Sequence, residues 1–317
     1  MATAEAWAAA ATAAASLGLS VEQLLVISFG LGLLLAVAIA AYLTRKPVFL
    51  EGTSTYHSCE LIEKESLSHD VRRFRFKLPS PGHILGLPIG KHIFVRAKVN
   101  DETVIRSYTP VTDVDTEGYF DLVLKIYFPD PPKFPDGGIM SQHLNSLMIG
   151  DTADFCGPTG HIRYLDNGVF AIERKRRVDG KTSVELAHRP PAKNIGMIAG
   201  GTGITPMLQI LRHILHKEKG SNIQIWLLFA NKTENDILLQ KELEAVPGLN
   251  LWYTLDNPPV GWKYGEGFIT KEMLEEHMPP PSAQTQILMC GPPPMLKYAC
   301  VPNLEKLGYT PDMMIKF

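Results

Sequence analysis

Residues 194–307 alternate short apolar segments with amphipathic ones, and this alternation constrains the fold more than any other feature of the sequence. Short runs of Ile, Leu, Val and Met indicate buried strands, whereas the segments between them carry apolar residues at helical spacing. Helical crossovers between strands are typical of a parallel sheet, so we expect a parallel α/β domain here. The expected strands are 194–199, 223–230, 249–255 and 286–290. One expected helix begins at 206, and three others cover 236–245, 270–277 and 293–307.

The part of the chain before this region has strand-like patterns and no strong helical pattern. In the first expected strand, Phe74 and Phe76 fall on one face and Arg75 on the other. The others are rich in Val, Ile, Phe and Tyr, with Pro and Gly between them. Several short strands of this kind predict a β-barrel. The expected strands are 71–78, 92–99 and 120–128.

The N-terminal region contains an uncharged apolar run at residues 24–43. Twenty helical residues rise roughly 30 Å, which matches the hydrocarbon core of a bilayer. Arg45 and Lys46 follow the run, and positive charge on that side predicts that the rest of the chain stays in the cytosol. We therefore expect an N-terminal transmembrane helix that attaches the chain to a lipid bilayer.

A cleaved signal peptide is the alternative for this segment, because residues 38–40 (Ala-Ile-Ala) resemble a cleavage site. A secretory signal begins with a basic region and has an apolar core of about 7–15 residues. Here no Lys or Arg precedes the run, and the run is longer. The sequence therefore favours an anchor.

Charge and cysteine content exclude two classes of protein. The 31 basic and 33 acidic residues give a net charge of −2, so no basic excess suggests a nucleic-acid partner. The four cysteines form no CxxC pair and no cluster with histidine at zinc spacing. We expect reduced thiols, a cytosolic environment and no metal site.

Two segments have the chemistry to bind a phosphorylated planar cofactor. Arg106 could hold a diphosphate, Tyr108 could cover an aromatic ring, and Thr109 could donate a hydrogen bond to its edge. The segment that contains them, residues 106–110, would also suit an ordinary strand end. The glycine-rich turn at 200–203 follows an expected strand and opens an expected helix, with Thr205 as N-cap and Pro206 as first helical residue. Such a turn lets a phosphate approach the backbone, but no Gly-Lys-Ser/Thr follows, so it is not a P-loop.

Two further segments end expected strands of the parallel sheet. Asp256 could accept hydrogen bonds from ribose hydroxyls and repel a 2′-phosphate, although a simple turn acid remains the alternative. The Cys-Gly-Pro-Pro-Pro segment at 290–294 builds a rigid turn at the same edge. Buried cysteine usually has a packing role, and no base is expected near Cys290.

Taken together, residues 60–317 resemble the NADH–cytochrome b5 reductase family of the ferredoxin–NADP reductase-like superfamily. The resemblance rests on RSYTP at 106–110, LKIYF at 124–128, GGIMSQ at 137–142, AGGTGITPM at 199–207, YTLD at 253–256 and CGPPPM at 290–295. It implies an FAD-binding β-barrel domain followed by a parallel-sheet NADH-binding domain. With the anchor, the expected domains are 1–46, leader and membrane helix; 47–165, FAD domain; 166–192, linker hairpin; and 193–317, NADH domain.

The resemblance also implies roles for individual residues. Arg106, Tyr108 and Thr109 correspond to a flavin-binding triplet, and Thr109 with His92 corresponds to a pair proposed to relay a proton. A satisfied strand histidine is the alternative for His92. Cys290 would lie near the reacting nicotinamide carbon. The other implied cofactor-binding residues are Lys125, Tyr127, Gly138, Met140, Ser141, Gly200, Gly201, Thr202, Gly203, Thr205, Pro206, Asp256, Gly291, Pro292, Pro293, Met295 and Phe317.

The implied electron acceptor is a separate protein, cytochrome b5, because no haem motif, iron–sulfur ligand set or flavodoxin-like segment is visible in this chain. One position departs from the family: Ile139 stands where a docking lysine is usual, although the basic run 174–177 could compensate if it is not simply a solvated hairpin. The resemblance places such an enzyme on the endoplasmic reticulum or the mitochondrial outer membrane. The alternatives are a reductase of quinones or ferric chelates, and a nucleotide-binding sensor that has lost its flavin.

Overall fold

The computed structural model describes residues 18, 20–43, 45–132, 134–178 and 181–317. The chain divides into two compact units, residues 1–47 and 48–317. In the first unit, helix α2 covers Val21–Leu43, and the expected leader at 1–17 lies outside the described residues. Within the described ranges, none of the helices has the length and apolarity needed to cross a membrane. The transmembrane helix expected at 24–43 is therefore not confirmed.

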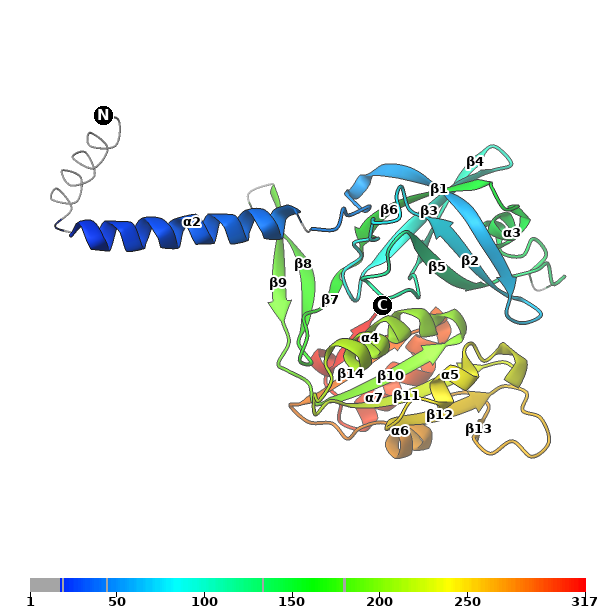
Figure 1. Ribbon diagram of the computed structural model, residues 1–317. Coiled ribbons are helices and arrows are strands. Elements are labelled where there is room, and N and C mark those ends of the chain that lie inside the picture. Colours follow the sequence, from blue (N-terminus) through cyan, green and yellow to red (C-terminus); the bar gives the residue numbers. More distant parts are fainter. Residues whose placement is uncertain (1–17, 19, 44, 133, 179–180) are drawn as a thin grey trace. The chain divides into compact units, whose positions relative to one another are not determined.

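The second unit begins with a curved six-stranded antiparallel sheet in the order β4-β3-β6-β1-β2-β5 (Figure 1). This confirms the expected barrel-like domain. The pairing places β1 between β2, which follows it directly in the sequence, and β6, which lies far along the chain. The strands are β1 (Gly52–Ser66), β2 (Val71–Lys77), β3 (His92–Val99), β4 (Glu102–Tyr108), β5 (Tyr119–Lys125) and β6 (Thr152–Thr159).

Aromatic side chains fill the interior of this sheet. Phe76, Phe120 and Phe155 pack with ring centroids 4.7 to 5.7 Å apart, and all three are fully buried. Phe74 is also fully buried, as the alternation in its strand predicts. Helix α3 (Ile139–Ser146) closes one side of this core through Met140 and Leu144.

The C-terminal half of the unit is a parallel sheet in the order β13-β12-β11-β10-β14-β15 (Figure 1). This confirms the parallel α/β domain. Strand β12 has the expected bounds, whereas the two short edge strands, β13 and β15, were not foreseen from their patterns. The strands are β10 (Asn194–Gly200), β11 (Gln224–Asn231), β12 (Leu249–Leu255), β13 (Gly265–Glu266), β14 (Thr285–Cys290) and β15 (Met314–Lys316).

The helices of this domain differ from expectation at two places. Helix α4 begins at Ile204 with Gly203 as N-cap, so the N-cap predicted at Thr205 is wrong. The Thr205 hydroxyl lies inside the first turn and donates to the carbonyl of Thr202 at 3.1 Å. The helix expected at 236–245 is short because Leu239 has a left-handed backbone. The helical segments are α4 (Ile204–Lys217), η2 (Glu234–Asp236), α5 (Gln240–Glu244), α6 (Lys271–His277), the π-helical η3 (Met295–Cys300) and α7 (Val301–Lys306).

A small three-stranded sheet follows the barrel strands. It consists of β7 (Ile162–Tyr164), β8 (Phe170–Val178) and β9 (Lys181–His188), in that order. Strands β8 and β9 fall in the segment expected to be a linker hairpin, 166–192, whereas β7 precedes it.

The two domains share one hydrophobic core. Ile89 and Val111 of the barrel domain belong to the same buried cluster as Ile204 and Met207 of α4. At this junction, the backbone N–H of Gly90 donates to the side-chain oxygen of Gln209 at 2.7 Å. Burial of apolar surface thus fixes the two sheets against each other.

Candidate cofactor site

The Arg-Ser-Tyr-Thr segment lies at one end of the β3–β4 pair. Ile93 of β3 pairs with Tyr108, the last residue of β4, so the neighbouring His92 and Thr109 lie side by side at the strand ends. Arg106 is exposed and donates to the carbonyl of Ile105 at 2.8 Å. Burial raises the pKa of Tyr108 to about 12, which keeps its ring neutral at physiological pH.

A second strand end and a helix start lie beside Tyr108. The Tyr127 hydroxyl raises the pKa of Tyr108 electrostatically, and the Tyr127 side chain is 45% exposed. The N–H of Gly138 donates to the Tyr127 carbonyl at 2.7 Å, and Ser141 Oγ accepts from the Tyr127 N–H at 3.1 Å. A Cβ on Gly138 would lie 2.6 Å from Ser141 Oγ and 2.9 Å from Tyr127 Cβ. Only glycine fits this contact between strand end and helix.

Helix α3 therefore begins directly beside two aromatic rings. Its N-cap, Gly138, has no side-chain cap, so the first-turn amide groups, including those of Met140 and Ser141, lack a capping acceptor. Unpaired amides at a helix N-terminus favour an anion. The cluster thus offers aromatic surface and an anion-binding helix end together, as a flavin with its diphosphate requires. Ile139 is 42% exposed at this position.

His92 is half-buried and faces a glycine. A Cβ on Gly160 would lie 3.0 Å from His92 Nδ1, so the imidazole edge packs directly on backbone. Burial, then the charge of Lys91 and of His161, lower the pKa of His92 below its ordinary 6.5. His92 is therefore neutral at pH 7, able to donate from one ring nitrogen and accept at the other.

The glycine turn after β10 meets the turn after β14. Ala199 and Cys290 pair across the two strands, and a Cβ on Gly203 would lie 2.2 Å from the Cys290 carbonyl oxygen. A Cβ on Gly291 would lie 3.2 Å from the Gly200 backbone. Both parallel strands thus end in backbone-to-backbone contact.

Gly201 differs from these packed glycines. It has a left-handed φ of +53°, and a Cβ built on it would meet nothing within 4 Å. An open backbone position at a turn that leads into α4 is what a nucleotide phosphate needs for close approach. Thr202 is half-buried beside it, while Thr205 and Pro206 are buried inside the first turn of the helix.

The glycine turn also contacts the barrel domain. The 3₁₀ segment η1 (Gly201–Gly203) packs against β5, the strand that ends at Lys125. The carboxyl edge of the parallel sheet therefore meets the end of the barrel domain where β5 ends.

Lys125 bridges the two domains at this junction. Its Nζ lies 2.5 Å from Asp70 Oδ2 of the barrel domain and 2.5 Å from Asp236 Oδ1 of the α/β domain. The other Asp236 oxygen accepts from the N–H and the hydroxyl of Thr233, at 2.9 and 2.7 Å. Reasoning from the sequence missed both carboxylates. The available signal was their position: Asp70 directly precedes β2, and Asp236 follows β11 by a few residues.

The remaining predicted residues lie at the carboxyl edge of the parallel sheet. Asp256 directly follows β12 and is exposed, and the Phe317 N–H donates to the Met289 carbonyl of β14 at 3.0 Å. Burial raises the pKa of Cys290 to about 11, so its sulfur is a thiol and a weak nucleophile at pH 7. Pro292 and Pro293 are exposed, and Met295 is half-buried against Gly200.

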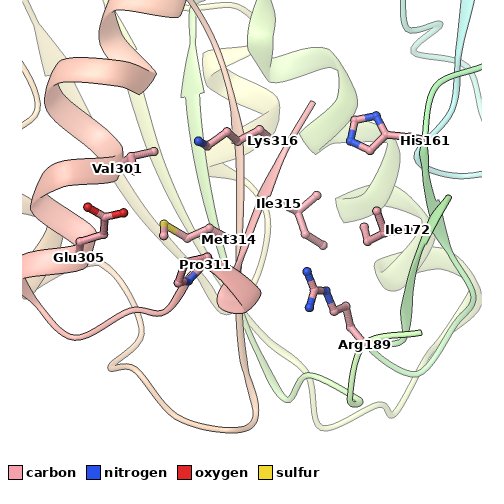
Figure 2. A pocket seen from close by; sticks show the side chains of 9 residues that line it. All are labelled: His161, Ile172, Arg189, Val301, Glu305, Pro311, Met314, Ile315 and Lys316. Carbon is pink, nitrogen blue, oxygen red and sulfur yellow. The ribbon is translucent and has the colours of Figure 1, made fainter. Parts of the chain in front are cut away.

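A separate cavity of about 290 Å³ lies between the linker sheet and the C-terminal segment (Figure 2). None of the predicted cofactor-binding residues lines it. Its walls carry His161, Arg189 and Lys316 on one side and Glu305 on the other. It is therefore not the contact region of β5 and η1 described above.

Comparison with known proteins agrees with this geometry. Residues 58–164 match the oxidoreductase FAD-binding domain family, and residues 197–301 match the oxidoreductase NAD-binding domain family. FAD and NADH are thus the cofactors of this fold.

Curated relatives cover most of the chain. NADH-cytochrome b5 reductase 2 of Xenopus laevis is 51% identical over 86% of this chain and 91% of its own length. The human protein of the same name is 48% identical over 86% of this chain and 98% of its own length. The crystal structure of the cytochrome b5 reductase domain of Ulva prolifera nitrate reductase has a TM-score of 0.75 and 44% identity, covering 86% of this chain and all of that one. The chain belongs to the NADH-cytochrome b5 reductase family of FAD-dependent oxidoreductases.

Proposed function

We propose that this protein oxidises NADH with bound FAD and passes the electrons, one at a time, to cytochrome b5. The observation that carries the proposal is the contact between η1 and β5, which brings the glycine turn to the end of the barrel that presents Tyr108 and Tyr127. Bound FAD supplies the conversion of a two-electron hydride into single electrons. The protein supplies binding, orientation and proton handling.

On the barrel side, the proposed FAD site combines an arginine, two aromatic rings and a helix end. Tyr108 would cover the ring system of bound FAD, Arg106 would hold its diphosphate in place of the Ile105 carbonyl, and Thr109 would donate to the ring edge. The first-turn amides of α3, at Met140 and Ser141, hold the diphosphate from the other side. Gly138 keeps Tyr127 close to this helix end.

On the α/β side, the proposed NADH site follows the carboxyl edge of the sheet. Gly201 gives the diphosphate access to the backbone, and Asp256 accepts from the ribose hydroxyls. The rigid turn after Cys290 places the nicotinamide, with the neutral thiol as a packing surface beside it. The Phe317 N–H donates to the Met289 carbonyl, which places this residue beside the strand that ends at Cys290.

His92 and Thr109 form the proposed proton path. The neutral imidazole exchanges a proton with the Thr109 hydroxyl, which carries it to the ring edge that Thr109 faces. The imidazole would take up a replacement proton from solvent at its other ring nitrogen and so remain neutral at pH 7.

The identity of the acceptor is tested by rapid kinetics on the purified holoenzyme. We expect a yellow protein that NADH bleaches before cytochrome b5 is added, and that then reduces ferricytochrome b5 with a far higher kcat/KM than quinones or ferric chelates. A higher kcat/KM for those small acceptors would instead identify a general reductase. A colourless protein that still binds NADH would identify a nucleotide sensor.

We further propose that residues 1–46 attach the enzyme to a membrane, with residues 47–165 as FAD domain, 166–192 as linker and 193–317 as NADH domain. Helix α2 supports the attachment because Phe29, Leu34 and Leu35 are each more than 60% exposed on it, and exposed apolar surface of this kind binds lipid. A reductase and an acceptor tethered to one membrane, either endoplasmic reticulum or mitochondrial outer membrane, would meet at high effective concentration. The full chain should sediment with liposomes and a chain lacking residues 1–46 should not; equal sedimentation of both would refute the attachment.

A further inference from the structure

Three potential metal ligands meet on the side of α4 that faces the linker sheet. His213 Nε2, on α4, lies 2.6 Å from Asp166 Oδ1 and 4.0 Å from Glu218 Oε1. All three ligand atoms lie within 4.8 Å of one another. Asp166 belongs to the turn between β7 and β8, and Glu218 is the C-cap residue of α4. The cluster therefore joins two elements that are distant in sequence, and it belongs to neither cofactor region.

One oxygen of this cluster lacks the partner that a buried carboxylate needs. The Glu218 side chain is only 7% exposed, and its Oε2 accepts from the N–H of Asn167 at 2.9 Å. The Tyr164 hydroxyl is a further hydrogen-bond partner of this carboxylate, but Oε1, the oxygen closest to His213, is buried and has no hydrogen-bond partner of its own. Leaving a buried carboxylate oxygen unsatisfied is costly, and a cation at this point would remove the cost.

The surrounding backbone holds the cluster in place. Asp166 and Asn167 both have left-handed backbones, with φ of 67° and 50°, and this sharp turn directs Asp166 toward the helix. The Gly168 N–H donates to the Tyr164 hydroxyl at 3.0 Å, and the Tyr164 ring packs edge-on against His213 with centroids 5.8 Å apart. The imidazole is thus oriented by a neighbour that is not itself a ligand, as is usual around metal-binding histidines.

We propose that Asp166, His213 and Glu218 bind one Zn²⁺ ion that ties the β7–β8 turn to the C-terminal end of α4. One imidazole nitrogen and two carboxylate oxygens are zinc ligands, and a water completes the tetrahedron. Ligands about 2.1 Å from such an ion lie roughly 3.4 Å apart in a tetrahedral site. This value falls between the distances from His213 Nε2 to Asp166 Oδ1, 2.6 Å, and to Glu218 Oε1, 4.0 Å. Asp166 has the freedom to adjust, because its side chain is 57% exposed.

Zinc binding at this place has a consequence for the fold. Helix α4 starts at the glycine turn and ends at Glu218, so the ion fixes the far end of the helix whose near end carries the proposed nucleotide site. The ion stabilises the folded chain by mass action, because the three ligands come together only when the β7–β8 turn is folded against α4.

The test uses the full-length holoenzyme in detergent, stripped with a chelator and then dialysed against micromolar ZnCl₂. We expect one zinc per flavin by elemental analysis, and a rise in the thermal unfolding temperature with zinc. Asp166→Asn and Glu218→Gln, which keep size and hydrogen-bonding ability, should each weaken zinc binding more than tenfold and abolish the rise. The flavin content of each variant shows whether it has folded.

His216→Gln is the matched control. His216 lies one turn along α4, is 54% exposed and contacts Asp113 instead of the cluster, so the variant should bind zinc like the parent. The proposal is overturned if the parent binds no zinc, which would leave the cluster as a histidine hydrogen-bonded to Asp166. It is equally overturned if Asp166→Asn and Glu218→Gln bind zinc as tightly as the parent and His216→Gln do, because the ion would then lie elsewhere.

Discussion

Lys125 and Asp236 form an ion pair, with Nζ and Oδ1 2.5 Å apart, that joins the proposed FAD domain to the proposed NADH domain. Asp70 Oδ2 lies 2.5 Å from the same Nζ on the barrel side, so one ammonium pairs with two carboxylates that are each only 9% exposed. Lys125, one of the predicted cofactor-binding residues, thus also holds the two domains together. A dinucleotide bound in the cleft would compete with these carboxylates for Lys125.

Replacing Lys125 with Met should destabilise the protein and weaken NADH binding together. The two carboxylates would stay buried without a counter-charge, which costs about 3 kcal/mol in the free energy of unfolding. Urea unfolding measures this loss, and steady-state kinetics should show a raised KM for NADH. Lys271→Met, which removes an exposed pair with Glu275, should cost about 0.5 kcal/mol or less. Equal losses in the two variants would show that the bridge carries no special stability.

The contribution of this bridge should depend on pH at both extremes. Burial alone raises the pKa of Asp236, but hydrogen bonds from Lys125 and Thr233 outweigh it and leave the pKa lowered. Its stabilisation is therefore fully present above 3.8, the pKa of an unfolded aspartate, and is lost as pH falls through the lower folded-state pKa.

For Lys125 the sign is reversed. Burial lowers its pKa, yet the bonds to Asp236 and Asp70 raise it above 10.5, so its stabilisation is present below 10.5 and lost as pH rises through the folded-state pKa. The difference in unfolding free energy between the parent and Lys125→Met should thus stay constant from about pH 5 to pH 9 and shrink outside this range. A maximum confined to pH 6–7 would point to a histidine instead.

His92→Gln should remove the acid limb of the pH profile for flavin reduction by NADH. The lowered pKa of His92 places this limb below pH 6.5 in the parent. His161→Gln removes one of the charges that lower the pKa, so it should move the limb to higher pH while leaving the rate at pH 7.5 nearly unchanged. Stopped-flow traces across pH 5–8 measure both. An unchanged profile in His92→Gln would make His92 a structural strand histidine.

Asp256→Thr should raise the ratio of kcat/KM for NADPH to that for NADH by roughly tenfold, because it removes a carboxylate that repels a 2′-phosphate. Asp256 is exposed at the end of β12, so folding and flavin content should not change. Glu266→Gln removes an exposed charge from the adjacent strand β13 and serves as the control. If both variants change the ratio equally, the effect is general electrostatics and Asp256 has no specific role.

Ile139→Lys should lower the KM for cytochrome b5 and leave the reduction of ferricyanide unchanged. Ile139 is 42% exposed at the start of α3, beside the proposed flavin site, where a cation would attract an acidic partner. The gain should disappear at high ionic strength. Met148→Lys adds the same charge at a 72% exposed position beyond the end of α3, and it should have a smaller effect.

The local patterns in the sequence were sufficient for three of the six barrel strands and for the four inner strands of the parallel sheet. Strand β12 has its predicted bounds, and Thr270 caps α6 at the start of the helix predicted there by accepting from the Met273 N–H. These features depend on residues a few positions apart, whose alternation or capping chemistry acts before any tertiary contact forms. Thr205 was misassigned as a cap because its hydroxyl could equally satisfy a carbonyl inside the first turn.

Tertiary structure alone decided what lies between the domains. Asp70, Lys125 and Asp236 come together across more than 100 residues, and Asp166 meets His213 across 47. No spacing rule predicts such neighbours, because their distance depends on how two sheets pack around the shared core of Ile89, Val111 and α4. The sequence determined which chemistry each domain carries, and the packing of apolar surface between the domains determined which charges meet.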